Sequence, residues 1–321
     1  MNFKSAALMI STALLAVSAG AQNFPAKPVR MIVPYAPGGG VDIMGRITAT
    51  RLSERLGVQV VVENRGGGGT VIGTDAVAKA AADGYTLLFG NPALSANPAL
   101  NDKLPYDTLK HLAPVAMVAA SFNVLVVHPS VPVKSVRELV ALAKSKPGQL
   151  NYASAGDGSA IYLAMAMFQN TAGIDVVHIP YKGAGPALVD VVGGQVPMMF
   201  IASPPAVTYV NSGKLRALGV SGVKRLLVLP EVPTIAEAGY KGFEVNNWYG
   251  VLAPGETPRA VVTHLNADIN ALINSADVRE RMAALGAEPA GGTPEQFAQR
   301  VRDEIALWHK VFAKTPAGRT R

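Results

Sequence analysis

Short apolar runs alternate with amphipathic segments along most of the chain. The first run, at 29–33, is rich in apolar residues, and the helical pattern that follows at 42–56 has Ile43, Ile47 and Leu52 on one side. These are the signatures of a buried strand and of an amphipathic helix. The alternation continues, with strands expected at 58–62, 85–89, 150–153, 176–180, 196–201 and 215–220 and helices at 71–82, 160–171 and 186–193. Strands and helices in this order form right-handed βαβ units, so we predict an α/β fold with mainly parallel sheets flanked by helices.

The region between the two sets of βα units predicts how the chain is divided. Residues 90–110 are typical of loops, and strand character returns at 114–119 and 124–127. We interpret 120–123 as the crossing into a second lobe and 245–253 as the return strand. The predicted division is a first lobe made of 22–122 plus 248–321 and a second lobe made of 123–247, with a cleft between them.

Capping signals predict where several later helices begin. The segments 135–138 and 234–237 have a hydroxyl residue followed three positions later by glutamate, which is a capping box. The end of the chain is predicted to be helical, because apolar residues from Val261 to Ile273 share one stripe and a last helix begins at Thr293.

The first residues have the pattern of an export signal rather than of a folded element. Lys4 precedes an apolar run at 6–19, and Ala19 and Ala21 are the small residues that a signal peptidase reads. The run is shorter than the ~20 residues that cross a bilayer, which disfavours the alternative of a membrane anchor. We therefore predict a signal peptide at 1–21, cleaved after Ala21, and a periplasmic protein.

Composition narrows the classes of partner. The chain has 29 basic and 22 acidic residues and no cysteine. The basic residues are scattered and aromatic residues are few, whereas nucleic-acid binders concentrate both on one face. We expect no nucleic-acid partner, and without cysteine neither disulfides nor thiolate metal sites can form.

Two glycine-rich turns have the outline of an anion cradle. Gly38, Gly39 and Gly40 lie between the first strand and the first helix, and the segment 154–159 repeats that order with two hydroxyls and a carboxylate. Glycine loops of this kind bring backbone N–H groups and a helix N-terminus to a ligand, although a single one often makes only a tight turn. Nucleotide binding is poorly supported, because Ile43 stands where a third spaced glycine would be and the loop at 66–69 has no following lysine.

Side chains that could carry out catalysis each have a structural alternative. Ser159 and the other serines lack the G-x-S-x-G context. Asp42 and Asp157 could form a carboxylate pair, but Asp42 is more simply a helix cap. Trp248 either packs in a core or lines the cleft beside the predicted return. The five histidines are far apart and are interpreted as structural or surface residues: His111, His128, His178, His264 and His309.

The order and spacing of nine short blocks resemble the extracytoplasmic solute receptors of the tripartite tricarboxylate transporter type, the Bug family. The blocks are VPYAPGGG at 33–40, ENR at 63–65, DGYTLL at 83–88, KLPYD at 103–107, YASAG at 152–156, HIPYKG at 178–183, GKLRAL at 213–218, PEVPT at 230–234 and WYG at 248–250. Together they cover nearly the whole of the chain after the export signal.

This resemblance implies a two-lobed periplasmic-binding-protein fold, also called a Venus flytrap, that closes on a small carboxylic acid. It implies a receptor without enzymatic activity or cofactor, a monomer that docks on a membrane permease. We expect no metal site. The ligand-binding positions that we predict are Tyr35, Ala36, Pro37, Gly38, Gly39, Gly40, Asp42, Asn91, Ser154, Ala155, Gly156, Asp157, Gly158, Ser159, Tyr181, Ile201, Ala202 and Trp248.

Four positions depart from the usual residues of that family and concern the far end of the ligand: Val41, Asp157, Tyr162 and Ile201. An apolar residue at 201 disfavours an amine on the ligand, and Asp157 would repel an additional carboxylate. We therefore expect a monocarboxylate, or a small aromatic or apolar acid, rather than citrate. Two rival hypotheses remain, an exported enzyme with Asp157 as general base and a protein that presents its ligand to a membrane sensor.

Overall fold

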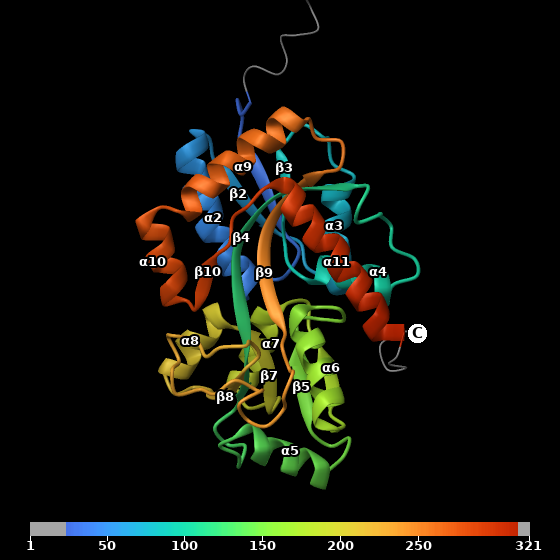
Figure 1. The fold of residues 1–321 in the computed structure, drawn as a ribbon, viewed down its shortest axis with the longest axis vertical. Coiled ribbons are helices and arrows are strands. Elements are labelled where there is room, and N and C mark those ends of the chain that lie inside the picture. Colours follow the sequence, from blue (N-terminus) through green and yellow to red (C-terminus); the bar gives the residue numbers. More distant parts are fainter. Residues whose placement is uncertain (1–23, 314–321) are drawn as a thin grey trace, which may run out of the picture.

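The computed structural model describes residues 24–313 and has two lobes joined by long strands (Figure 1). The predicted signal peptide and its cleavage site lie outside the described residues. Within 24–313, no helix has both the length and the apolar character needed to cross a membrane.

The first lobe is built on the predicted parallel strands. β1 (Val29–Val33) lies between β2 (Val60–Asn64) and β3 (Thr86–Gly90), with Met31 opposite both Val62 and Leu87. Four of the five β1 residues are buried, as expected for a strand covered on both faces. The connecting helical segments are α2 (Gly40–Leu56), the short η1 (Gly68–Thr70) and α3 (Val71–Ala78).

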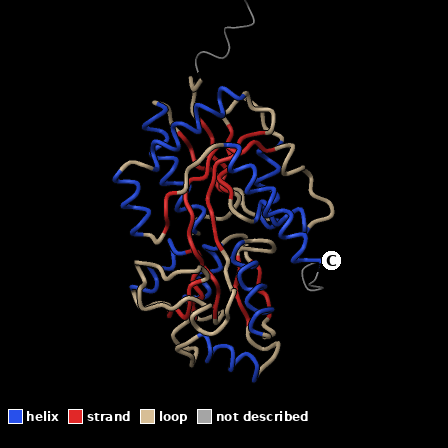
Figure 2. Tube along the Cα trace, viewed as in Figure 1, coloured by secondary structure: helices blue, strands red, loops and turns tan. Residues whose placement is uncertain are grey.

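The second lobe repeats this arrangement. β5 (Asn151–Ser154) pairs in parallel with β6 (Val177–Pro180) and with β7 (Met198–Ala202). The strands occupy the middle of each lobe and the helices cover them (Figure 2). The other elements of this lobe are α5 (Val136–Ser145), α6 (Ala160–Ala172), α7 (Ala184–Val192), α8 (Ser203–Asn211) and β8 (Arg216–Val220).

Two antiparallel strands connect the lobes, β4 (Leu112–Val127) and β9 (Asn246–Pro254). The strands expected at 114–119 and 124–127 are one element, because β4 is continuous over 16 residues, and the crossing that we placed at 120–123 lies within it. Its first part pairs with β9 as far as Phe122, and from Asn123 onward it pairs with β7. The backbone groups therefore have partners on both sides of the crossing, and the strand does not need to end there.

The carboxyl-terminal helices lie against the first lobe (Figure 1). One correction concerns 90–110, where the structure has a helix, α4 (Ala93–Leu100), that packs Ala96 and Leu100 against Trp308 and Phe312. A second concerns 234–237, where the reciprocal capping bonds form but support only a turn. The remaining elements are α9 (Arg259–Ile273), α10 (Ala276–Ala284), β10 (Ala287–Pro289) and α11 (Pro294–Ala313).

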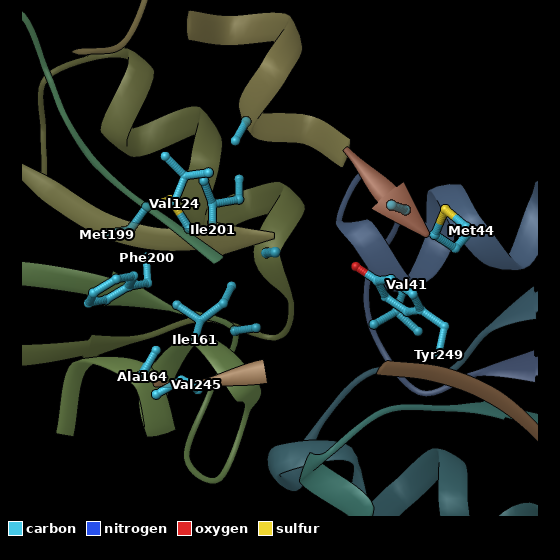
Figure 3. Packing of buried hydrophobic residues seen from close by; sticks show 14 of the residues in the cluster. Val41, Met44, Val124, Ile161, Ala164, Met199, Phe200, Ile201, Val245 and Tyr249 are labelled. Carbon is cyan, nitrogen blue, oxygen red and sulfur yellow. The ribbon is translucent and has the colours of Figure 1, made fainter. Parts of the chain in front are cut away.

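A single large apolar cluster extends through both lobes. Figure 3 shows Val124, Met199 and Ile201 on the side of the second lobe and Met44 and Tyr249 on the side of the first. Because the core is continuous across the crossing strands, it fixes the ends of the strands and helices that face the space between the lobes.

Candidate ligand-binding site

A small inner cavity of about 30 Å³ lies where several helices begin. α2 contributes Gly40, Val41 and Asp42, and α6 contributes Ala160 and Ile161. The complete lining is Tyr35, Gly39, Gly40, Val41, Asp42, Asn91, Asn123, Ala155, Ser159, Ala160, Ile161, Ala184, Ala202 and Asn247.

The ends of these helices give the cavity the character of an anion site. The first residues of α2, α6 and α7 and the residue before α8 all line it. The N-caps of α2 and α7, Gly39 and Gly183, make no side-chain capping bond. Unpaired N–H groups and the positive ends of the helix dipoles therefore face the cavity. The lining contains no lysine, arginine or histidine, so the available donors are neutral.

Close approach of the chain at this cavity requires glycine. A Cβ atom on Gly40 would lie 2.7 Å from the hydroxyl oxygen of Tyr249 and 2.8 Å from the Cβ of Ala202. Gly38 has a φ of +94°, a conformation that residues with a side chain rarely adopt. The glycine run thus allows the loop to pack against the neighbouring elements while its amides stay close to the cavity.

Asp42 holds the glycine loop in place. Its carboxylate accepts hydrogen bonds from the Gly38 N–H at 3.0 Å, from Arg46 Nε at 3.0 Å and from Asn64 Nδ2 at 2.9 Å. Burial raises the pKa of Asp42, but the hydrogen bonds from Arg46, Gly38 and Asn64 outweigh burial and leave that pKa below its ordinary value. Gly39 is the N-cap of α2, and Asp42 is the third residue of this helix. The Asp42 carboxylate therefore binds the preceding loop from within the first turn of the helix.

The corresponding turn of the second lobe is supported by a side-chain network that runs from the buried Ser154 to the exposed Asp157. Ser154 Oγ accepts the Gly156 N–H at 3.0 Å and lies 2.6 Å from His178 Nε2, while His178 Nδ1 lies 3.4 Å from Asp157 Oδ1. The order serine, histidine, aspartate is that of a hydrolytic triad, but Ser154 is fully buried and its oxygen is occupied by the turn. The network supports the loop, which agrees with the structural interpretation of His178.

A larger mouth pocket of about 340 Å³ adjoins the inner cavity and shares Tyr35 and Ala155 with it. Its lining combines Gly67, Gly68, Gly69 and Thr70 from the first lobe with Gly156, Asp157, Tyr181 and Lys182 from the second. Burial and the hydrogen bond to Asp190 raise the pKa of Tyr181 to about 12. Three residues of the glycine loop at 66–69, from Gly67 to Gly69, therefore border the cleft.

The two lobes touch beside this mouth. The Ala36 N–H donates to the Lys182 carbonyl at 3.1 Å. A Cβ on Gly185 would lie 1.9 Å from the Pro37 carbonyl oxygen, and one on Gly69 would lie 2.1 Å from the Asp157 carbonyl oxygen. The lobes are therefore closed on each other along bare backbone.

The structure distributes the predicted positions over four groups. Eight line the inner cavity and five the mouth, with Tyr35 and Ala155 in both. Ala36, Pro37, Gly38, Ser154 and Gly158 lie in the two supporting turns without lining either pocket. Ile201 is fully buried in the core and lines neither pocket, so the prediction that it contacts the ligand disagrees with this geometry.

Trp248 is a clear correction. Its side chain is fully buried, meets Phe297 edge to face, and its Nε1–H donates to both carboxylate oxygens of Glu304 at 3.0 and 2.8 Å. Successive residues of a strand point to opposite faces, so Asn247 reaches the inner cavity while Trp248 points to the core beneath α11. The alternative of core packing is correct, and cleft lining is wrong.

Sequence reasoning missed Asn123 and Asn247 in the lining of the inner cavity. The signal that could have found Asn247 is the alternation of β9, because a tryptophan in a core implies that its neighbour faces the other way. Asn123 had no such signal, since we had placed it at the crossing between two predicted strands.

Comparisons with known proteins agree with this geometry. The family model described as tripartite tricarboxylate transporter family receptor matches residues 44–316. Protein BugT of Bordetella pertussis is 41% identical over 312 residues, which cover 97% of this chain and 96% of BugT.

Solved structures give the same result. The periplasmic binding protein BugD superposes with a TM-score of 0.90 at 35% identity, covering 92% of this chain and 100% of BugD. R. palustris Rpa4515 with adipate superposes with a TM-score of 0.88 at 36% identity, covering 91% of this chain and 98% of that protein. The predicted two-lobed binding-protein fold is therefore confirmed. The chain belongs to the tripartite tricarboxylate transporter receptor family and is a solute-binding receptor of the Bug type rather than an enzyme.

Proposed function

We propose that this protein is a monomeric receptor of the periplasm that closes on a small carboxylic acid and delivers it to a membrane permease. The signal peptide at 1–21 would direct export. The moving bodies would be 22–122 with 248–321 and 123–247, which turn about β4 and β9. The BugD relative is described as a periplasmic binding protein, which supports the compartment.

One observation carries the proposal, the convergence of helix N-termini on a cavity without a cationic side chain. A carboxylate buried there would exchange its water for charge-assisted hydrogen bonds from backbone N–H groups, which offset the cost of burying a charge. Ser159 adds a hydroxyl, and its oxygen already accepts the Tyr162 N–H. The adipate held by Rpa4515 is a carboxylic acid, which supports the same class of ligand for this chain.

The surroundings favour one carboxylate over several. The inner cavity of about 30 Å³ has room for roughly two groups of the size of a water molecule in the closed state. At the mouth, the single lysine, Lys182, faces the same pocket as Asp157, whose charge opposes a further carboxylate. We therefore infer a monocarboxylate, or a small aromatic or apolar acid, rather than citrate.

Calorimetric titration of the purified protein with monocarboxylates and citrate tests this function. We expect one-to-one binding of at least one monocarboxylate, no binding of citrate, and no chemical change of the acid on prolonged incubation. Tight citrate binding without any response to monocarboxylates would contradict the ligand class, and formation of a product would contradict the receptor role.

A further inference from the structure

Two asparagine side chains at the floor of the inner cavity lack hydrogen-bond partners. Asn123 is 0% exposed, and neither its amide nitrogen nor its amide oxygen has a partner among residues 24–313. Asn247 is 2% exposed, and its amide oxygen is also unpartnered within this part of the chain. Buried polar side-chain atoms in native proteins nearly always have partners. Both residues line the inner cavity, so a bound molecule can supply what the chain does not.

The two side chains project from the strands that connect the lobes. Asn123 is on β4 and Asn247 is on β9, where Asn247 is opposite Ser121. Ser121 and Asn123 point to the same face because residues two apart on a strand do so. When the lobes open, the N-termini of α2 and α6 would separate, whereas these asparagines remain together on adjacent paired strands. They form the fixed floor of a site whose walls move.

The free atoms define the chemistry of the group that fits. The Asn247 amide nitrogen donates to the Tyr249 hydroxyl at 3.1 Å, and that hydroxyl lies 3.2 Å from Ser121 Oγ. Asn247 therefore presents an oxygen to the cavity, and Asn123 presents both an oxygen and an N–H group. The floor thus offers two acceptors and one donor group.

A neutral group that both donates and accepts satisfies this set. A hydroxyl or a carboxamide does so. A second carboxylate has only acceptor atoms, so it could not donate a hydrogen bond to the amide oxygens of Asn123 and Asn247. An ammonium group would need an anion, and the acid in the lining, Asp42, already binds Gly38, Arg46 and Asn64. The small volume of the cavity requires the neutral group to be close to the carboxylate.

We propose, resting on the carboxylate-receptor function above, that the Asn123 and Asn247 floor selects acids that carry a neutral hydroxyl or carboxamide near the carboxylate. The helix N-termini would bind the carboxylate, and the two asparagine side chains would form hydrogen bonds with the hydroxyl or carboxamide. A site that leaves polar atoms unpaired in the absence of that group discriminates against ligands that lack it.

Calorimetric titration with acids of one chain length tests the proposal: butanoate, 2-hydroxybutanoate, 3-hydroxybutanoate and succinate. We expect one of the hydroxy acids to bind about tenfold or more tightly than butanoate, and succinate to bind more weakly than that hydroxy acid. Equal binding of all four acids, or tightest binding of succinate, would overturn this inference while the receptor function stands. Binding of none of them while another monocarboxylate binds would also overturn the inference alone, whereas failure of every monocarboxylate to bind would overturn the proposed function.

Apolar variants of similar size then assign the effect to the floor. Asn123→Leu and Asn247→Leu should each reduce the ratio of the two affinities, the preferred hydroxy acid over butanoate, from about tenfold to about one. Asn246→Leu is the matched control, because Asn246 is the exposed neighbour on β9 and does not line the cavity. Retention of the preference in both floor variants, with folding verified by thermal melting, would contradict the assignment.

Discussion

At the scale of single residues, the site depends on side chains that hold two loops rather than on side chains that carry charge to a ligand. Asp42 ties the first loop to Arg46 and Asn64, and Ser154 ties the second to His178. The residues that face the inner cavity contribute backbone N–H groups, hydroxyls and amides. Charge is thus used to fix geometry, and neutral donors are left for binding.

Replacing Asp42 tests this role. Asp42→Asn keeps one acceptor but loses the charged bond with Arg46, so we expect a loss of about 1.5–3 kcal/mol in the free energy of unfolding near neutral pH. Because the folded pKa of Asp42 is lowered, its contribution is present above the unfolded pKa of about 4 and disappears as pH falls through the folded pKa.

Urea unfolding of variant and wild type near neutral pH and at strongly acidic pH measures this difference. The gap should shrink in acid, and the exposed Asp102→Asn should show no gap at either pH. A gap that grows in acid would contradict the account.

The sequence indicated the two loops but not the floor between them. Glycine runs after strands have a recognisable local pattern, and they predicted Gly38 to Gly40 and 154–159. Asn123 has no local pattern, and Asn247 can be placed only from the burial of its neighbour Trp248, because both positions follow from how β4, β7 and β9 pair and pack. Which face of β9 meets the cavity is set by the packing of Trp248 under α11, which is a tertiary fact.

At the scale of elements, α11 is fastened to β9 by a buried polar contact. Trp248 donates to Glu304, and Arg300 lies 3.0 Å from the same carboxylate. Burial raises the pKa of Glu304 in spite of the bonds from Trp248 and Arg300, which lower it. The helix α4 was not predicted, because the segment 90–110 contains three prolines and was interpreted as a loop. It packs on the end of α11. Pro98 lies inside α4, and tertiary packing outweighs its poor helix propensity.

Variants of Glu304 separate the hydrogen bond from the charge. Glu304→Ala leaves the buried Trp248 N–H without its acceptor and should cost about 1–3 kcal/mol of unfolding free energy. Glu304→Gln keeps an acceptor for the Trp248 N–H and removes the carboxylate charge. Because the pKa of Glu304 is raised in the folded state, ionisation of this group destabilises the fold as pH rises from about 4 through the folded pKa. Glu304→Gln should therefore lose less unfolding free energy near neutral pH than Glu304→Ala does.

Thermal melting and ligand titration of both variants check this expectation. Ligand affinity should be unchanged, because Trp248 points away from the inner cavity. A fall in affinity without a fall in stability would show that this contact belongs to the binding site after all.

At the scale of the whole molecule, two lobes meet along bare backbone. The division into βα units at either end of long connecting strands was visible in the hydrophobic pattern, because each strand and helix has its own period. The continuity of β4 was not, because it depends on partners contributed by β9, β7 and β8. Closure brings Gly185 against Pro37 and Ala36 against Lys182, so small residues at this seam are a requirement of the closed state.

Gly185→Ala should therefore hinder closure. Its new Cβ would lie 1.9 Å from the Pro37 carbonyl oxygen in the closed form, while an open form has no such contact. Overpacking of about 1–3 kcal/mol predicts a loss of affinity of roughly ten- to hundredfold. Titration calorimetry measures the affinity, and small-angle scattering measures whether the ligand still makes the molecule more compact.

Gly193→Ala, at the other end of α7, is the matched control, because its nearest contact is within its own helix. It should bind and close as the wild type does. An equal loss of affinity in both variants would attribute the effect to α7 rather than to the seam.

We propose that helix N-termini from both lobes hold a carboxylate between them. A crystal structure with the acid that binds most tightly in titration tests it most directly. We expect the carboxylate in the inner cavity, about 3 Å from backbone N–H groups at the starts of α2 and α6. An acid bound outside the cavity, or held by a lysine or arginine side chain, would contradict it.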